Sequence, residues 1–399
     1  MTVMENYTNE TSDTVEEWNS KLARVLIPNN VILSLYMIVG LVGNSTVIFI
    51  YGFKMKGNKI KGNKEERYFI PFLATADLCA SLVCASFGIA QNLMQATFDN
   101  EPLCKTWWFF AGLTTLISVF LLIVIAVHRY LKVCKPLGKQ MTLKWKWFAL
   151  GLCLAIALPL AGPMTYFYGS ESFFNDELKI YGRRCGRLST TNKTSSLIFG
   201  GSLVLTAIAI IVVLICLYSK VGYTIFVHFK YTKVLGNHNK TEYSRSGVST
   251  DDDPCSKSDM SSFETLETPT TITSAVYSTQ KTTCQIDTPV NKDKHLPKQS
   301  SRKRRRNKRI VHKFTLMFML ITIIFIICYI PKVIIMLLEA SNTKFWEGFS
   351  DAGRSAVSFV YRIYILNTVT NPFIYAFLDK KFSKEIKKLF KSCKILQFR

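Results

Sequence analysis

An uncharged stretch in the first third of the chain sets the strongest limit on the fold. Between Lys105 and His128 lie 22 residues, 106–127, without one ionisable side chain. At about 1.5 Å per residue, a helix of that length crosses the roughly 30 Å hydrocarbon core of a bilayer. A helix of a soluble core would carry a polar stripe, and none is visible here. The stretch from Cys104 to Tyr130 therefore predicts a membrane-spanning helix.

The composition of the whole chain fits a membrane protein with several spans. Its 399 residues have a mean hydropathy of +0.18, with 49% hydrophobic and 19% charged residues. The net charge of +23 would also suit nucleic-acid binding, but the basic residues cluster beside apolar runs and no recognised nucleic-acid-binding module accompanies them. We therefore expect no nucleic-acid partner. The 11 cysteines contain no CxxC pair, which argues against a zinc site.

Six further apolar runs accompany this stretch, and each is long enough to cross a bilayer. The seven predicted spans are Pro28–Phe53, Tyr68–Phe98, the stretch 104–130, Trp145–Tyr168, Ser196–Phe226, Val311–Leu338 and Ser355–Leu378. We expect an all-α membrane protein, a bundle of seven transmembrane helices.

Charge asymmetry between the connecting loops predicts the orientation. The loops after spans one, three and five are rich in Lys and Arg, whereas the alternate loops are mixed or acidic. Because cytoplasmic loops carry the excess of basic residues, the N-terminus is expected outside and the C-terminus inside, at the plasma membrane. Sequons at Asn6, Asn9 and Asn192 fall on the outer side and predict glycosylation there.

The remaining segments complete the layout. Residues 232–300 are rich in Ser, Thr, Asp and Lys, which predicts a disordered third cytoplasmic loop. After span seven, Phe382, Ile386, Leu389 and Phe390 share one helical face opposite lysines, which predicts a short amphipathic cytoplasmic helix on the inner leaflet. Cys393 is a candidate for palmitoylation, with an unmodified thiol as the alternative. The predicted parts are an outer tail 1–27, spans one to five in 28–231, the loop 232–300, spans six and seven in 301–378, and the amphipathic helix with the tail in 379–399.

Five short motifs on five different spans carry a resemblance to a known family. They are Gly43-Asn44, Leu73-Ala74-Thr75-Ala76-Asp77, His128-Arg129-Tyr130, Phe325-x-x-Cys328-Tyr329-x-Pro331 and Asn371-Pro372-x-x-Tyr375. In this order they resemble the rhodopsin-like (class A) G-protein-coupled receptors, over roughly residues 28–394 outside the long third loop. The resemblance implies a receptor and not an enzyme. It also implies a heterotrimeric G protein as partner, with kinases and arrestin as further partners.

The resemblance implies roles for buried polar residues and for the cytoplasmic end. Asn44, Ser118, Asn367 and Asn371 stand where the family surrounds its aspartate, here Asp77, and an allosteric sodium ion. Oxygen ligands around one carboxylate suit a small hard cation; a sodium-free polar network is the alternative, and no other cofactor is expected. The residues implied in the switch and in G-protein coupling are His128, Arg129, Tyr130, Tyr218, Phe325, Pro331, Pro372 and Tyr375. The family's loop disulfide corresponds to Cys104 and Cys185, on the side that is expected to be oxidising.

The chain departs from the family pattern around Arg129. His128 replaces the acidic residue that normally pairs with this arginine, and Val311 and His312 stand among cations where span six often carries an acid. We hypothesise either raised basal signalling or substitute polar partners for Arg129. On this hypothesis, His128→Asp should lower ligand-independent signalling.

Two positions exclude ligand classes. Ala111 stands where amine receptors carry an aspartate, which argues against a monoamine. Ile365 stands where opsins carry the retinal-binding lysine, which argues against light sensing. Tyr329 replaces the usual tryptophan and would place a hydroxyl in the pocket floor.

Two cations inside the spans give positive evidence on the ligand. Lys332 follows Pro331, and Arg362 lies beside Tyr361 at similar depth, so both are predicted to receive an acidic group. The alternatives are an internal ion pair with Glu339 or Asp77, or snorkelling to the headgroups. The residues predicted to bind ligand are Ala111, Tyr329, Lys332, Tyr361 and Arg362.

The outer loop 169–195 points to the size of the ligand. Its apolar and charged residues alternate around Cys185, which predicts a hairpin over a wide pocket, as in neuropeptide receptors. This favours a peptide with an acidic group. A small acidic metabolite or lipid is the alternative ligand, and a seven-span transporter or channel is the remote alternative function.

Overall fold

The described part of the chain divides into two units. The computed structural model describes residues 2–54, 65–245, 298–341, 345–346 and 348–396. One unit comprises Met1–His228 and Arg305–Arg399, and the other is Phe229–Arg304. The second unit contains the end of helix α8 (Lys193–Arg245) and the start of helix α9 (Lys298–Ser341). The segment 232–300 was predicted to be disordered; its residues 246–297 lie outside the described ones, whereas 232–245 and 298–300 are helical.

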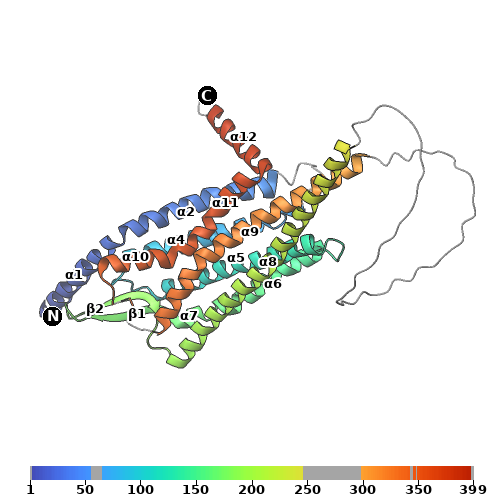
Figure 1. Ribbon diagram of the computed structural model, residues 1–399. Helices are drawn as coiled ribbons and strands as arrows, with labels where there is room; N and C mark the ends of the chain where they lie inside the picture. Colours follow the sequence, from blue (N-terminus) through green and yellow to red (C-terminus); the bar gives the residue numbers. More distant parts are fainter. Residues whose placement is uncertain (1, 55–64, 246–297, 342–344, 347, 397–399) are drawn as a thin grey trace, which may run out of the picture. The chain divides into compact units, whose positions relative to one another are not determined.

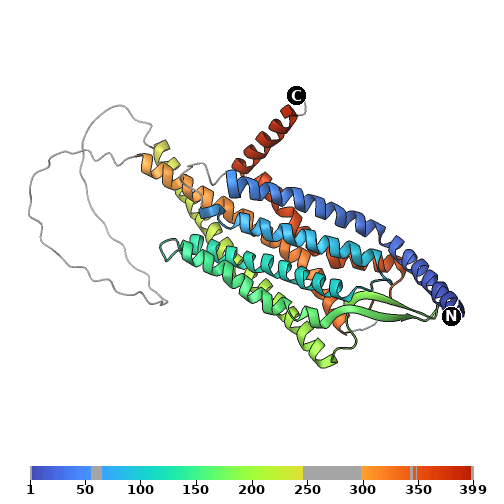
Figure 2. The ribbon, with the colours of Figure 1, turned by 180° about the vertical axis from the view of Figure 1, so that it is seen from behind.

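The first unit is built around helical rods that lie side by side (Figures 1 and 2). Six described stretches are long and apolar enough to cross a membrane, and they run over residues 27–54, 65–93, 101–134, 143–167, 194–227 and 309–339. The seventh rod is interrupted by a 3₁₀ turn, so that neither of its α-helical parts is long enough to span a bilayer alone. The rods are α2 (Ile27–Val47) with η1 (Ile48–Lys54), η2 (Glu65–Arg67) with α4 (Ile70–Leu93), α5 (Glu101–Cys134), α6 (Leu143–Ala161), α8, α9, and α10 (Asp351–Arg362) with η3 (Ile363–Ile365) and α11 (Leu366–Leu378).

Side chains are distributed as expected for a bundle surrounded by lipid. Large apolar residues such as Val42, Phe226 and Phe377 are exposed by 62%, 68% and 83%, whereas Asn44 and Asp77 are fully buried. This arrangement places apolar groups against hydrocarbon and gathers costly polar groups inside the bundle. The predicted seven-helix membrane fold is therefore confirmed.

One end of the bundle is covered by a helix and a hairpin. Helix α1 (Thr2–Val25) stands where the sequence predicted only a tail, and the Asn19 side chain fixes it by donating to Leu93 O and accepting from Ala96 N, each at 2.9 Å. After the short helix α7 (Met164–Phe167), strands β1 (Tyr168–Asn175) and β2 (Ile180–Arg187) form the predicted hairpin in antiparallel register. Trp18 of α1 packs on Phe173 of β1, with ring centroids 5.2 Å apart.

The other end carries α12 (Lys380–Leu396), the predicted amphipathic helix (Figures 1 and 2). Phe382 is fully buried and stacks on Tyr51 at 5.0 Å, and Ile386 and Leu389 pack against the same core. Helix α8 extends to Arg245, beyond the expected start of the loop at residue 232, because no proline interrupts it.

Candidate functional site

A cavity opens among α4, α5, α8, α9 and α10, on the half of the bundle nearest the hairpin. Its volume is about 140 Å³, counted as space open to the centre of a water-sized sphere. All five residues predicted to bind ligand line it: Ala111, Tyr329, Lys332, Tyr361 and Arg362. The sequence reasoning missed Tyr364, Trp108 and Tyr168, which also line it. Tyr364 could have been found from its position next to Ile365, on the same face of the seventh rod as Tyr361.

The Lys332 ammonium group lies among aromatic rings. Its Nζ is 3.4 Å from the ring centroid of Tyr364, 5.7 Å from that of Tyr361 and 5.8 Å from that of Tyr329. Ring faces attract a cation through their quadrupole but do not neutralise its charge. Among the described residues, no carboxylate lies within 4.0 Å of this nitrogen. The expected alternative of an ion pair with Glu339 is therefore not formed at Lys332 in the described part of the chain.

The Arg362 guanidinium is held by amides. It donates to Asn92 Oδ1 at 2.7 Å and to Gln91 Oε1 at 3.4 Å, and both acceptors belong to α4. Neither Glu339 nor Asp77 pairs with it; Glu339 accepts instead from Trp346 Nε1 at 3.2 Å. The cavity wall thus holds these two cations together with Arg187 of β2, and the partners found for Lys332 and Arg362 in the described chain are uncharged.

A disulfide fixes the hairpin over this cavity. Cys104 at the start of α5 is bonded to Cys185 of β2, with a Cα–Cα distance of 5.6 Å, so the predicted disulfide is confirmed. Gln91 Nε2 donates to Cys185 O at 3.1 Å, and Tyr168 of β1 stacks on Trp108 of α5 at 4.1 Å. Burial raises the pKa of Tyr168, so this side chain is neutral at pH 7.

Below the cavity, a polar network surrounds Asp77. Its Oδ1 accepts from Ser118 Oγ and its Oδ2 from Asn371 Nδ2, each at 2.6 Å. Asn44 Nδ2 donates instead to Thr368 O at 3.0 Å. The amide oxygens of Asn44, Asn367 and Asn371 are buried and have no partner among the described residues. One carboxylate with a hydroxyl and free amide oxygens fits a small hard cation such as sodium, although no described cluster of three His, Cys, Asp or Glu residues accompanies it.

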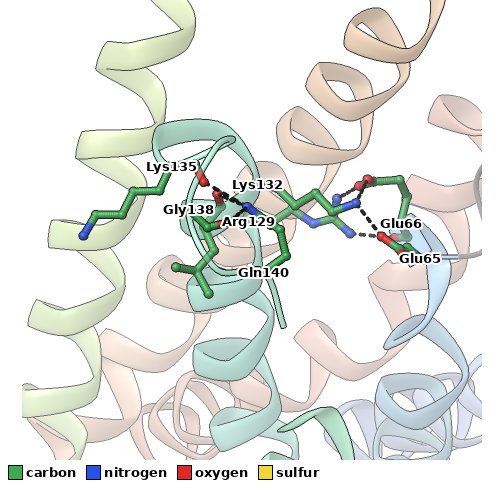
Figure 3. A network of polar contacts seen from close by, with 8 residues as sticks. Glu65, Glu66, Arg129, Lys132, Lys135, Gly138 and Gln140 are labelled. Carbon is green, nitrogen blue, oxygen red and sulfur yellow. Dashed lines mark hydrogen bonds and ion pairs between the residues drawn. The ribbon is translucent and has the colours of Figure 1, made fainter. Parts of the chain in front are cut away.

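At the end of the bundle away from the hairpin, Arg129 has a carboxylate partner that the motif reading missed (Figure 3). Its Nη1 pairs with Glu66 Oε2, and its Nη2 donates to Glu66 O. Lys132 Nζ lies 2.9 Å from both Glu66 Oε1 and Glu65 Oε2. His128 instead packs on Phe69 in a T-shaped arrangement, with ring centroids 5.4 Å apart. The available signal was that residues 65 and 66 are consecutive acids in a strongly basic loop.

The other predicted switch residues are spread over four rods. Pro331 lies within α9 and Pro372 within α11, and Phe325 packs on Tyr329 at 4.9 Å. Tyr218 and Tyr375 are both buried, but no hydrogen bond joins them within the described chain. Tyr130 lies near Lys135, whose Nζ is 6.0 Å from its ring centroid, and Gln140 closes the turn after α5 by donating to backbone carbonyls (Figure 3).

The predicted modification sites lie at the two ends. Asn192 is exposed just before α8, and its Oδ1 accepts from Thr194 N at 2.9 Å. Asn6 and Asn9 lie on α1, and Cys393 lies on α12, but these three side chains fall outside the described ones. Glycosylation and palmitoylation remain predictions.

Comparisons with known proteins agree with this geometry. Residues 43–375 match the family model described as 7 transmembrane receptor (rhodopsin family). The cholecystokinin receptor of Xenopus laevis is 22% identical over 381 residues, which cover 91% of this chain and 76% of that receptor. Galanin receptor type 3 of Mus musculus is 30% identical over 145 residues, or 36% of this chain and 39% of that receptor. The crystal structure of squid rhodopsin superposes with a TM-score of 0.61 at 13% identity, covering 94% of this chain and 87% of that one, which concerns the fold alone.

Proposed function

Because the chain belongs to the rhodopsin family of seven-transmembrane receptors, we propose that it binds an extracellular peptide carrying an acidic group and then activates a heterotrimeric G protein. The observation that carries this proposal is the Lys332 ammonium group, which lies in the cavity without a described carboxylate partner. A partly buried cation inside the membrane-spanning bundle is stabilised by a ligand that brings the missing negative charge. The acidic group of the ligand would pair with this ammonium group inside the cavity.

Two further features support a peptide as the ligand. The hairpin contributes Tyr168 and Arg187 to the cavity wall and carries Glu171, Arg183 and Arg184 beyond it, which a peptide could contact. The cholecystokinin and galanin receptors among the relatives are peptide receptors. A small acidic metabolite or lipid would fill only the part of the cavity around Lys332 and Arg362, and it remains the second candidate.

The charge distribution supports an orientation at the plasma membrane with the N-terminus outside. The hairpin end holds the disulfide, a bond typical of oxidising compartments. The opposite end is rich in Lys and Arg, as in cytoplasmic loops. Kinases and arrestin are proposed as further cytoplasmic partners, and sodium as an allosteric ligand of Asp77.

Activation of G proteins in membranes that contain the receptor tests the proposal. Nucleotide exchange is measured with peptide fractions and, separately, with acidic metabolites. For a ligand found in this way, Lys332→Met should lower its apparent affinity about 10- to 100-fold, since a hydrogen bond to a charged group contributes about 1.5–3 kcal/mol.

Two control variants make the result specific. Lys332→Arg retains the positive charge and should keep most of the affinity. Lys105→Met removes a lysine at the outer end of α5 whose charge is already paired with Glu101 at 2.6 Å, and it should have little effect. Equal affinity of Lys332→Met and wild-type receptor, at matched surface expression, would reject the acidic-group contact.

A further inference from the structure

Glu66 occupies an unusual position for a residue of a cytoplasmic loop. It lies in the short turn η2, directly before α4, yet only 5% of its surface is exposed. Its carboxylate and its backbone carbonyl both face the Arg129 guanidinium, and the second carboxylate oxygen accepts from Lys132 Nζ at 2.9 Å (Figure 3). The side chain of the neighbouring Glu65 is 72% exposed. It pairs with Lys132 and not with Arg129.

The burial of Arg129 explains why a partner is required. Only 1% of the residue is exposed, and a buried guanidinium without a counter-charge is strongly destabilising. The adjacent residue on α5 is His128, which offers no carboxylate. Glu66 therefore supplies the negative charge from a separate element, 63 residues earlier in the chain.

Helix α9 contacts the same guanidinium from the other side. The Arg129 Cζ lies 4.8 Å from the ring centroid of Phe318, and the Cζ of Arg67, also in η2, lies 4.8 Å from that of Phe314. Phe314 and Phe318 are one helical turn apart on α9. Residues 309–338 of this helix contain no acidic residue, so α9 offers neither arginine a carboxylate there. Its described contacts with Arg67 and Arg129 are the aromatic faces of Phe314 and Phe318. The packing of α9 at this end therefore depends on two cations: Arg67, which belongs to η2, and Arg129, which pairs with Glu66 of η2.

We infer that Glu66 is the positioning residue of Arg129: it holds the guanidinium inside the bundle under Phe318 and so maintains the resting arrangement of the cytoplasmic end. This inference rests on the proposed coupling to a G protein. A cytoplasmic protein cannot reach a guanidinium that is 1% exposed, so the pair with Glu66 must open before Arg129 meets any partner. The free energy of the pair then sets the population of the resting state.

The first readout is ligand-independent activation of G protein by the full-length receptor in membranes. Glu66→Gln keeps the size of the side chain and removes its charge. It should raise ligand-independent activation about fivefold or more, in line with coupling free energies of about 1–3 kcal/mol. Glu65→Gln is the matched control, because it removes the neighbouring carboxylate but not the contact with Arg129, and it should leave basal activation unchanged.

A rescue variant separates positioning from a general loss of stability. His128→Glu places a carboxylate beside Arg129 on α5 itself. In the Glu66→Gln background it should return basal activation towards the wild-type level, whereas in the wild-type background, where Glu66 already pairs with Arg129, its effect should be smaller. Glu66→Asp keeps the charge but shortens the side chain, and it should give an intermediate rise if Glu66→Gln does not reach the surface.

Hydrogen–deuterium exchange of the purified receptor gives a second readout that needs no G protein. Glu66→Gln should increase exchange in residues 309–321 of α9, and Glu65→Gln should not. Unchanged exchange in Glu66→Gln, or an equal rise in both variants, would overturn the inference. Increased exchange without nucleotide exchange on any G protein would instead refute the proposed coupling and leave the role of Glu66 standing.

Discussion

The ion pair between Arg67 and Asp379 permits a quantitative prediction about stability. The Asp379 carboxylate, between α11 and α12, accepts from Arg67 Nε at 2.9 Å, Arg67 Nη2 at 3.1 Å, Tyr51 Oη at 2.8 Å and Lys381 N at 3.0 Å. The side chains of Arg67 and Asp379 are only 11% and 6% exposed. Arg67→Met would remove two of these four hydrogen bonds and leave a buried carboxylate without its counter-charge.

The expected loss of stability follows from these contacts. Removing one partner of a buried ion pair costs about 3–5 kcal/mol. The carboxylate keeps its hydrogen bonds from Tyr51 and Lys381, and methionine retains the apolar part of the replaced side chain, so we expect the lower end, about 3 kcal/mol. Asp379→Asn removes the charge that Arg67 compensates. In a double-mutant cycle the two changes should therefore couple by about 1.5–3 kcal/mol.

The assay is the free energy of unfolding of purified receptor in mild detergent, titrated with a denaturing detergent. Lys54→Met is the matched control. Lys54 pairs with Glu385 of α12 at 2.8 Å, but these side chains are 35% and 21% exposed, so its loss should cost less than about 1 kcal/mol. If Arg67→Met costs no more than Lys54→Met, or if the cycle gives no coupling, the burial argument is refuted.

Two further predictions concern the interior of the bundle. If sodium binds at Asp77, replacing choline chloride with sodium chloride should raise the thermal stability of the wild-type receptor, and Asp77→Asn should abolish this difference; an equal response of both proteins to sodium would contradict the site. Gly40→Leu should cost about 1–3 kcal/mol of stability, because a Cβ there would clash with Ser81 Oγ and force α2 away from α4. Gly151→Leu is its control, since a Cβ at that position meets no atom within 4 Å, and equal costs at the two positions would rule out close packing as the cause.

Much of the fold could be predicted from the sequence because a bilayer imposes long apolar runs. The apolar runs predicted which residues form the membrane-spanning helices. The polar residues within the runs, such as Asp77 and Lys332, predicted which helix faces point into the bundle. The alternation around Cys185 similarly predicted the hairpin. Helix α1 was not predicted from the sequence. Trp18 contacts the hairpin and Asn19 contacts the end of α4, and such contacts between distant segments cannot be inferred from the local sequence of α1.

The partner of Arg129 shows why the end of the bundle opposite the hairpin could be predicted only in part. The motif reading looked for a carboxylate beside Arg129 in the chain and at the inner end of span six, and found none at either place. The compensating carboxylate, however, is a neighbour in space, and it became visible only when the packing of η2 against α5 was known. The absent acid at 128 and the buried acid at 66 are therefore best understood together: the guanidinium remains neutralised, but from the loop between the first two spans. A restraint within α5 would move rigidly with Arg129, whereas one from η2 can be released by relative motion of the two elements. The hypothesis of substitute polar partners thus has a specific candidate in Glu66, and high basal signalling is expected only when that carboxylate is removed.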